Sequence, residues 1–83
     1  VGDSMIGAGI QEKDLLIVSS KTEPTHGKIV IAAINGEYTV KRLHRGNEGI
    51  KLMPANDAYP PIDITGNMDF HIAGVVVKIL RSL

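Results

Sequence analysis

The sequence predicts a mostly β protein, a compact antiparallel barrel or sandwich of five to seven short strands. Three observations predict this fold class. The apolar segments are short and separated by turn residues, an Asn-Gly pair lies between two β-rich runs, and only residues 4–10 suggest a helical turn. Gly7 and Gly9 are expected to keep that turn to a single short piece.

The 83 residues are expected to form one domain, residues 1–83, because a chain of this size supports a single small core. The expected strands cover residues 14–20, 28–34, 37–43, 50–54 and 70–80, with a short edge segment near the Pro60-Pro61 pair. Ala73 and Gly74 are interpreted as a packing or bulge site within the last strand. That strand is also predicted to have an open edge, where two subunits could pair.

Composition excludes several classes of function. Nine basic and nine acidic side chains cancel, so strong direct nucleic-acid binding by this domain is not expected. The chain has no cysteine, and its histidines at 26, 44 and 71 are too far apart for a compact ligand motif, so neither a metal nor a cofactor is expected. These histidines are interpreted as scattered surface residues, and the basic run at residues 41–45 as a solvated strand end. No apolar run is long enough to span a membrane and no signal peptide is visible, so we expect a cytoplasmic protein.

The Asn35-Gly36 pair is the strongest local signal, because both residues tolerate the positive φ angles of a two-residue hairpin turn. Such a turn sets Val30 opposite Lys41. Alternation then places Lys41 on one face with five mostly apolar side chains: Val30, Ala32, Ile34, Thr39 and Leu43. If this face is buried, desolvation lowers the pKa of Lys41, and the neutral amine can take a proton from a hydroxyl group. Alternatively, Lys41 extends along its own stem to solvent.

Ser4 is the candidate hydroxyl group. It comes just before the turn "MIGAG", whose backbone N–H groups could stabilise an oxyanion while Ser4 attacks a carbonyl. The alternative is that Ser4 only shapes the turn, as serine commonly does after Gly-Asp. Asp3 is interpreted as a turn residue, not as the acid of a catalytic triad.

Five segments in the same order resemble the LexA/UmuD family of Ser–Lys self-cleaving peptidases: "GDSM", "GIQEKDLLIV", "HGKIVIAAINGEYTVKRL", "LMPANDAYPPI" and "FHIAGVVVKIL". The resemblance covers nearly the whole chain and is stronger to the UmuD branch than to the LexA repressors. It implies that Ser4 is the nucleophile and Lys41, 37 positions later, its general base. It also implies an oxyanion hole made by the backbone amides of Asp3 and Ser4.

The same resemblance implies what the domain does and what it contacts. Family members cleave their own N-terminal arm when a RecA filament on single-stranded DNA stimulates them. In the UmuD branch the processed homodimer then joins UmuC, the catalytic subunit of an error-prone translesion DNA polymerase. No cleavable arm precedes Ser4 here, so we expect the sequence to be the processed or core form.

Two other functions fit some of these features. One is the C-terminal self-cleavage and dimerisation domain of a LexA-like or phage repressor, which would carry a helix-turn-helix in its N-terminal region. The other is a signal-peptidase relative, which shares the Ser–Lys pair. Ile6, where such enzymes normally carry a proline, and the lack of a membrane-inserting segment argue against that relative.

Overall fold

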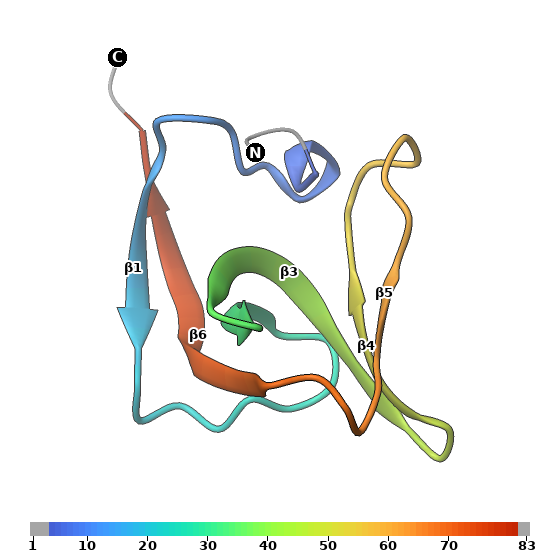
Figure 1. Ribbon diagram of the computed structural model, residues 1–83. Coiled ribbons are helices and arrows are strands. Elements are labelled where there is room, and N and C mark those ends of the chain that lie inside the picture. Colours follow the sequence, from blue (N-terminus) through green and yellow to red (C-terminus); the bar gives the residue numbers. More distant parts are fainter. Residues whose placement is uncertain (1–3, 82–83) are drawn as a thin grey trace.

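A computed structural model describes residues 4–81 as one six-stranded antiparallel sheet with the strand order β1-β6-β2-β3-β4-β5 (Figure 1). The mostly β fold class is confirmed. A single 3₁₀ turn, η1, precedes the sheet at the position expected for the helical turn. The elements are η1 (Ile6–Ala8), β1 (Leu15–Ser19), β2 (Ile29–Ile34), β3 (Glu37–Gly46), β4 (Gly49–Met53), β5 (Ile62–Ile64) and β6 (Phe70–Leu80).

The hairpin of β2 and β3 has the predicted turn and register. Asn35 and Gly36 adopt φ angles of 50° and 87°, the positive values that a two-residue turn needs. The first pair beyond the turn is Ile34 with Glu37, and the pairing continues to Val30 with Lys41. The local sequence therefore determines which face of β3 carries Lys41.

Strand β3 is shared between two neighbours. Its first part, from Glu37 to Arg42, pairs with β2, whereas β4 pairs with β3 only from Arg42 to Gly46. Figure 1 shows β3 curving across the middle of the molecule between these two neighbours. Within residues 4–81, the β4-facing edge of residues 37–41 therefore has no strand partner.

The core lies on the face of the hairpin that carries Lys41. Its buried members come from four strands: Val30, Ala32, Leu43, Leu52 and Val75. Partly buried apolar residues of β2, β4, β5 and β6 pack around them. The sequence left open whether this face is buried. The structure turns it inward, since three of the five residues expected to share it with Lys41 have no exposed surface.

Strand β6 corrects one expectation. It pairs with β1 and with β2, so it is an interior strand, and the edge strands of the sheet are β1 and β5. The predicted bulge is confirmed, because the pairing with β2 shifts between Gly74 and Ile72. A side chain on Gly74 would overlap Val18 of β1.

Among the described residues, no helix has the length and apolar character needed to cross a membrane.

Candidate active site

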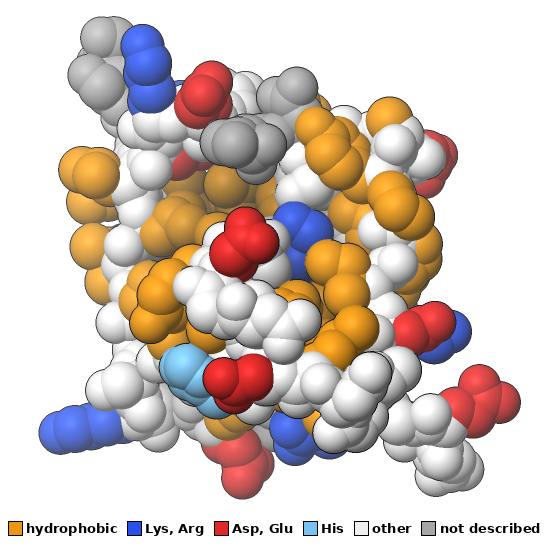
Figure 2. Space-filling view, in the orientation of Figure 1, with side chains coloured by type: hydrophobic (Ala, Val, Ile, Leu, Met, Phe, Trp, Pro, Cys, Tyr) orange, Lys and Arg blue, Asp and Glu red, His pale blue; other side chains and the backbone are white. Residues whose placement is uncertain are grey.

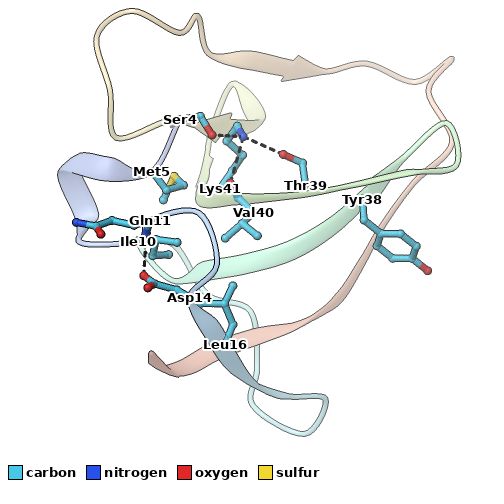
Figure 3. Close-up of a pocket in the computed structure, with 10 residues that line it drawn as sticks. All are labelled: Ser4, Met5, Ile10, Gln11, Asp14, Leu16, Tyr38, Thr39, Val40 and Lys41. Carbon is cyan, nitrogen blue, oxygen red and sulfur yellow. Dashed lines mark hydrogen bonds between the residues drawn. The ribbon is translucent and has the colours of Figure 1, made fainter. Parts of the chain in front are cut away.

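Lys41 is one of two buried polar or charged residues in the described chain, with 9% of its surface exposed. Its Nζ atom donates hydrogen bonds to Ser4 Oγ at 2.7 Å, to Thr39 Oγ1 at 2.8 Å and to the Val40 carbonyl oxygen at 3.2 Å (Figure 3). These three acceptors match the three N–H donors of an ammonium group. None of them carries a charge, so they do not offset the loss of water around the ammonium.

Burial lowers the pKa of Lys41 below its ordinary value of 10.5. The cause is desolvation, which disfavours the charged form of an amine. A lysine with a lowered pKa has a larger neutral fraction at a given pH, and only the neutral amine accepts a proton. The environment of Lys41 therefore suits a general base.

Ser4 is the second buried polar residue, with 5% of its surface exposed. It lies just before η1, and two backbone hydrogen bonds hold this turn against the loop between β4 and β5. The Ala55 N–H donates to the Ser4 carbonyl oxygen, and the Gly7 N–H donates to the Ala55 carbonyl oxygen, both at 2.7 Å. A side chain on Gly7 would overlap that Ala55 oxygen, so this close approach depends on glycine.

A groove of about 300 Å³ opens over the Ser4–Lys41 pair. Figure 2 shows a hollow on this face, rimmed by hydrophobic side chains and with a cationic side chain deep inside it. Its walls come from the N-terminal segment, β1 and the first half of β3: Ser4, Met5, Ile10, Gln11, Asp14, Leu16, Tyr38, Thr39, Val40 and Lys41 (Figure 3). A groove of this size, with partly apolar walls, can hold a short stretch of an extended peptide.

The structure brings the two predicted catalytic residues, Ser4 and Lys41, into direct contact. The predicted oxyanion hole stays a prediction, because Asp3 lies outside the described residues. Thr39 was predicted only to share the face of Lys41, and its hydrogen bond to Nζ was missed. The signal was present, since a hydroxyl two positions earlier in a strand lies on the same face as the lysine.

The histidines and the basic run differ in part from the expectation. His26 and His44 are not scattered, because their rings lie 4.9 Å apart and His26 Nδ1 accepts the Arg45 N–H. The hairpin carries the second half of β3 past the loop before β2, where Leu43 exchanges backbone hydrogen bonds with Gly27 and Lys28, and this brings the two rings together. Arg42 is also half-buried and donates to the Gly27 carbonyl oxygen at 2.7 Å. Within residues 4–81, no three His, Asp or Glu side chains gather closely enough to hold a metal ion.

The profile of the family described as Peptidase S24-like matches residues 1–77. Three curated relatives are similar over nearly the whole chain. The LexA repressor of Syntrophotalea carbinolica is 48% identical over 80 residues, which cover 96% of this chain and 40% of the relative. LexA repressor 1 of Xanthomonas oryzae pv. oryzae is 45% identical over 81 residues, with 98% and 40% covered. The LexA repressor of Delftia acidovorans is 43% identical over 81 residues, with 98% and 36% covered.

The chain thus spans about 40% of the length of these relatives. Their names agree with the repressor alternative, whereas none of the three carries the name UmuD, the branch expected from the sequence segments. The match over residues 1–77 and the identities of 43–48% over nearly the whole chain show the family. The chain belongs to the Peptidase S24-like family.

Proposed function

We propose that this chain is the self-cleavage and dimerisation domain of a LexA-like transcriptional repressor, and that it acts as a serine peptidase with Ser4 as nucleophile and Lys41 as general base. The observation that carries the proposal is the 2.7 Å contact between Lys41 Nζ and Ser4 Oγ inside a groove. Similarity to proteins named LexA repressor supports the biological setting.

The chemistry is acyl transfer through a covalent intermediate. When Lys41 is neutral, its lone pair accepts the proton of the Ser4 hydroxyl, and Oγ attacks the carbonyl carbon of the scissile peptide bond. The new ammonium group keeps two of its N–H donors on Thr39 Oγ1 and the Val40 carbonyl oxygen and turns the third toward the leaving nitrogen. That nitrogen takes the proton and departs as an amine. Water, deprotonated by Lys41, then hydrolyses the acyl-serine and regenerates both residues.

The peptide to be cut is expected to bind as an extended strand. In the hairpin the backbone groups of Ile34 and Glu37 face each other, so by alternation those of Tyr38 and Val40 point away from β2. The described chain has no strand on that side, and both residues line the groove. An extended segment can pair with these outward groups, where the Val40 carbonyl oxygen uses the lone pair that does not accept from Lys41 Nζ. This pairing would carry the carbonyl of the segment past Ser4.

The test is the full-length protein at alkaline pH, where Lys41 is neutral. We expect it to yield two fragments, and Ser4→Ala and Lys41→Ala to remain intact, with a loss of at least about a hundredfold in rate because each removes one member of the proton-transfer pair. Lys78→Ala, which removes an exposed lysine of β6, is the matched control and is expected to cleave like the wild type. Cleavage of Ser4→Ala at the wild-type rate would disprove the assignment.

The proposed setting includes a RecA filament on single-stranded DNA as the stimulating partner and a homodimer as the functional state. UmuD-type action with a UmuC-type polymerase is the competing assignment, because segments such as "GVVVKIL" resemble that branch. The residues that precede this domain in the intact protein decide between them. A helix-turn-helix there supports the repressor, and a short arm without one supports the polymerase subunit.

A further inference from the structure

The segment from Ser4 to Asp14 carries the nucleophile without belonging to the sheet. Its apolar anchors are Met5 and Ile10, both buried. At its start, the paired hydrogen bonds with Ala55 hold the Ser4 turn. At its other end, the Arg81 side chain reaches back from the residue after β6. Contacts at both ends of the segment, together with its two apolar anchors, therefore hold Ser4 in place.

Arg81 makes three hydrogen bonds to this segment. Its Nε donates to Asp14 Oδ1 at 2.9 Å, and its Nη2 donates to Asp14 Oδ2 at 2.8 Å and to the Gly9 carbonyl oxygen at 2.6 Å. The Asp14 side chain is only 3% exposed, and its Oδ2 also accepts the Gln11 N–H at 2.8 Å (Figure 3). A two-pronged arginine–carboxylate pair fixes orientation as well as distance.

The contact continues from Gly9 to Ser4 through the backbone of the turn. The Gly9 N–H donates to the Ile6 carbonyl oxygen at 2.9 Å, and the Ile10 N–H donates to the Met5 carbonyl oxygen at 3.2 Å. Met5 is the residue that follows Ser4. A shift of the Gly9 peptide is thereby passed to Ser4 in two short steps.

We propose that Arg81 is a positioning residue for the reaction: through Asp14 and Gly9 it holds the turn at the distance that keeps Ser4 Oγ in contact with Lys41 Nζ. This inference rests on the proposed peptidase function. The contact is 2.7 Å long, so a movement of about 1 Å breaks the hydrogen bond. Misplacement of that size is enough to slow an enzyme by up to about a hundredfold.

The position of Arg81 gives the proposal a measurable signature. Its side chain is 48% exposed, so dissolved salt screens its attraction to Asp14. High salt is therefore expected to slow the reaction of Ser4 in the wild-type protein and to have little effect once Arg81 is removed. If Arg81 served only to fix the end of β6, its contacts would stabilise the fold, but the reactivity of Ser4 would not depend on salt in this way.

The experiment compares Arg81→Ala, Arg81→Lys and Asp14→Asn with the wild type in the full-length protein. The rate of Ser4 modification by a fluorophosphonate probe is measured at alkaline pH and well below the melting temperature, at low salt and at about 1 M salt. The self-cleavage rate is measured alongside. We expect Arg81→Ala to slow both reactions about tenfold and Arg81→Lys to lie between it and the wild type, because lysine keeps the charge but loses the two-pronged geometry.

Lys51→Ala is the matched control, since it removes the ion pair with Asp63 on β4 and β5, outside the groove. The proposal is overturned if Arg81→Ala reacts at the wild-type rate, or if Lys51→Ala slows the reaction equally. Arg81→Lys carries the same test if Arg81→Ala does not fold: a wild-type rate in Arg81→Lys counts against the proposal, because lysine cannot reproduce the two-pronged geometry. A Ser4→Ala variant separates the proposed peptidase function from the proposed role of Arg81. A Ser4→Ala protein that still cleaves refutes the peptidase function itself, not the role of Arg81.

Discussion

Lys41 and Ser4 meet in one hydrogen bond, but they reach it in different ways. Lys41 lies five residues beyond a two-residue turn, on a strand paired with β2 and next to fully buried core residues. Ser4 lies in a short turn outside the sheet, held by Ala55 on one side and by Arg81 on the other. The base is therefore placed by local sequence, and the nucleophile by contacts between distant segments.

This difference separates stability from reactivity. Damage to the hairpin is expected to unfold the domain, because the same strand supplies the core and the base. Damage to the contacts of the Ser4 turn is expected to slow the reaction while the sheet stays folded.

The largest effect is expected from Leu43→Ala. Leu43 has no exposed surface and pairs with Leu52 across β3 and β4, so its truncation leaves a cavity in the core. We expect a loss of about 2–5 kcal/mol in the free energy of unfolding, measured by urea denaturation. Val77→Ala, at a side chain that is 52% exposed, is the control and is expected to cost much less. Equal losses of unfolding free energy in the two variants would show that the buried face of the hairpin is not a main source of stability.

Gly7→Ala tests the expectation that the contacts of the Ser4 turn control reactivity. The added methyl group would overlap the Ala55 oxygen and push the Ser4 turn away from its support. We expect the rate of fluorophosphonate modification of Ser4 to fall at least about tenfold. The urea midpoint is expected to change little. Gly46→Ala adds a methyl group in open space and should leave the rate unchanged. If Gly7→Ala unfolds the protein as Leu43→Ala does, reactivity and stability are not separable here.

The pH dependence sharpens the role of Lys41. Because its folded pKa is lowered, modification of Ser4 should rise with pH with a midpoint below 10.5. Lys41 binds its proton more tightly in the unfolded chain than in the folded protein. Its contribution to the free energy of unfolding is therefore smallest at pH values below the folded pKa, and it grows as the pH rises toward the pKa of the unfolded chain. The slope is at most about 1.4 kcal/mol per pH unit. Lys41→Met should remove this slope from the urea denaturation series, and an unchanged slope would contradict a lowered pKa.

Thr39→Val is expected to have the smallest effect. Valine keeps the shape of the side chain but removes one of the three acceptors of the Lys41 ammonium group. The charged form loses more than the neutral form, so the midpoint of the pH–reactivity curve should move to lower pH. The same probe reaction measures it, with Thr65→Val in an exposed turn as the control. If the midpoint does not move, the Thr39 hydroxyl does not stabilise the charged form of Lys41.

The sequence predicts the parts of this molecule that depend on local rules. The Asn35-Gly36 turn, the register of the hairpin and the set of residues on the face of Lys41 follow from turn chemistry and strand alternation, and the structure has all three. The sequence left open whether this face is buried, and the structure buries it. Residue pattern alone suggested Ser4 only as a candidate, and the resemblance to a family selected it. The supports of Ser4 could not be predicted, since they join residues 48 and 72 positions apart. The interior place of β6 was missed for the same reason, because strand order depends on long-range pairing.

The free half of β3 also bears on the solubility of the protein. An unpaired strand edge offers a template to any neighbouring chain and invites aggregation. Here that edge forms part of the groove wall, facing the Ser4 turn and Leu16, instead of lying along the rim of the sheet. A single extended peptide enters such a recess more readily than the edge of another molecule's sheet does. The arrangement that admits a substrate thus also guards the protein against uncontrolled self-association.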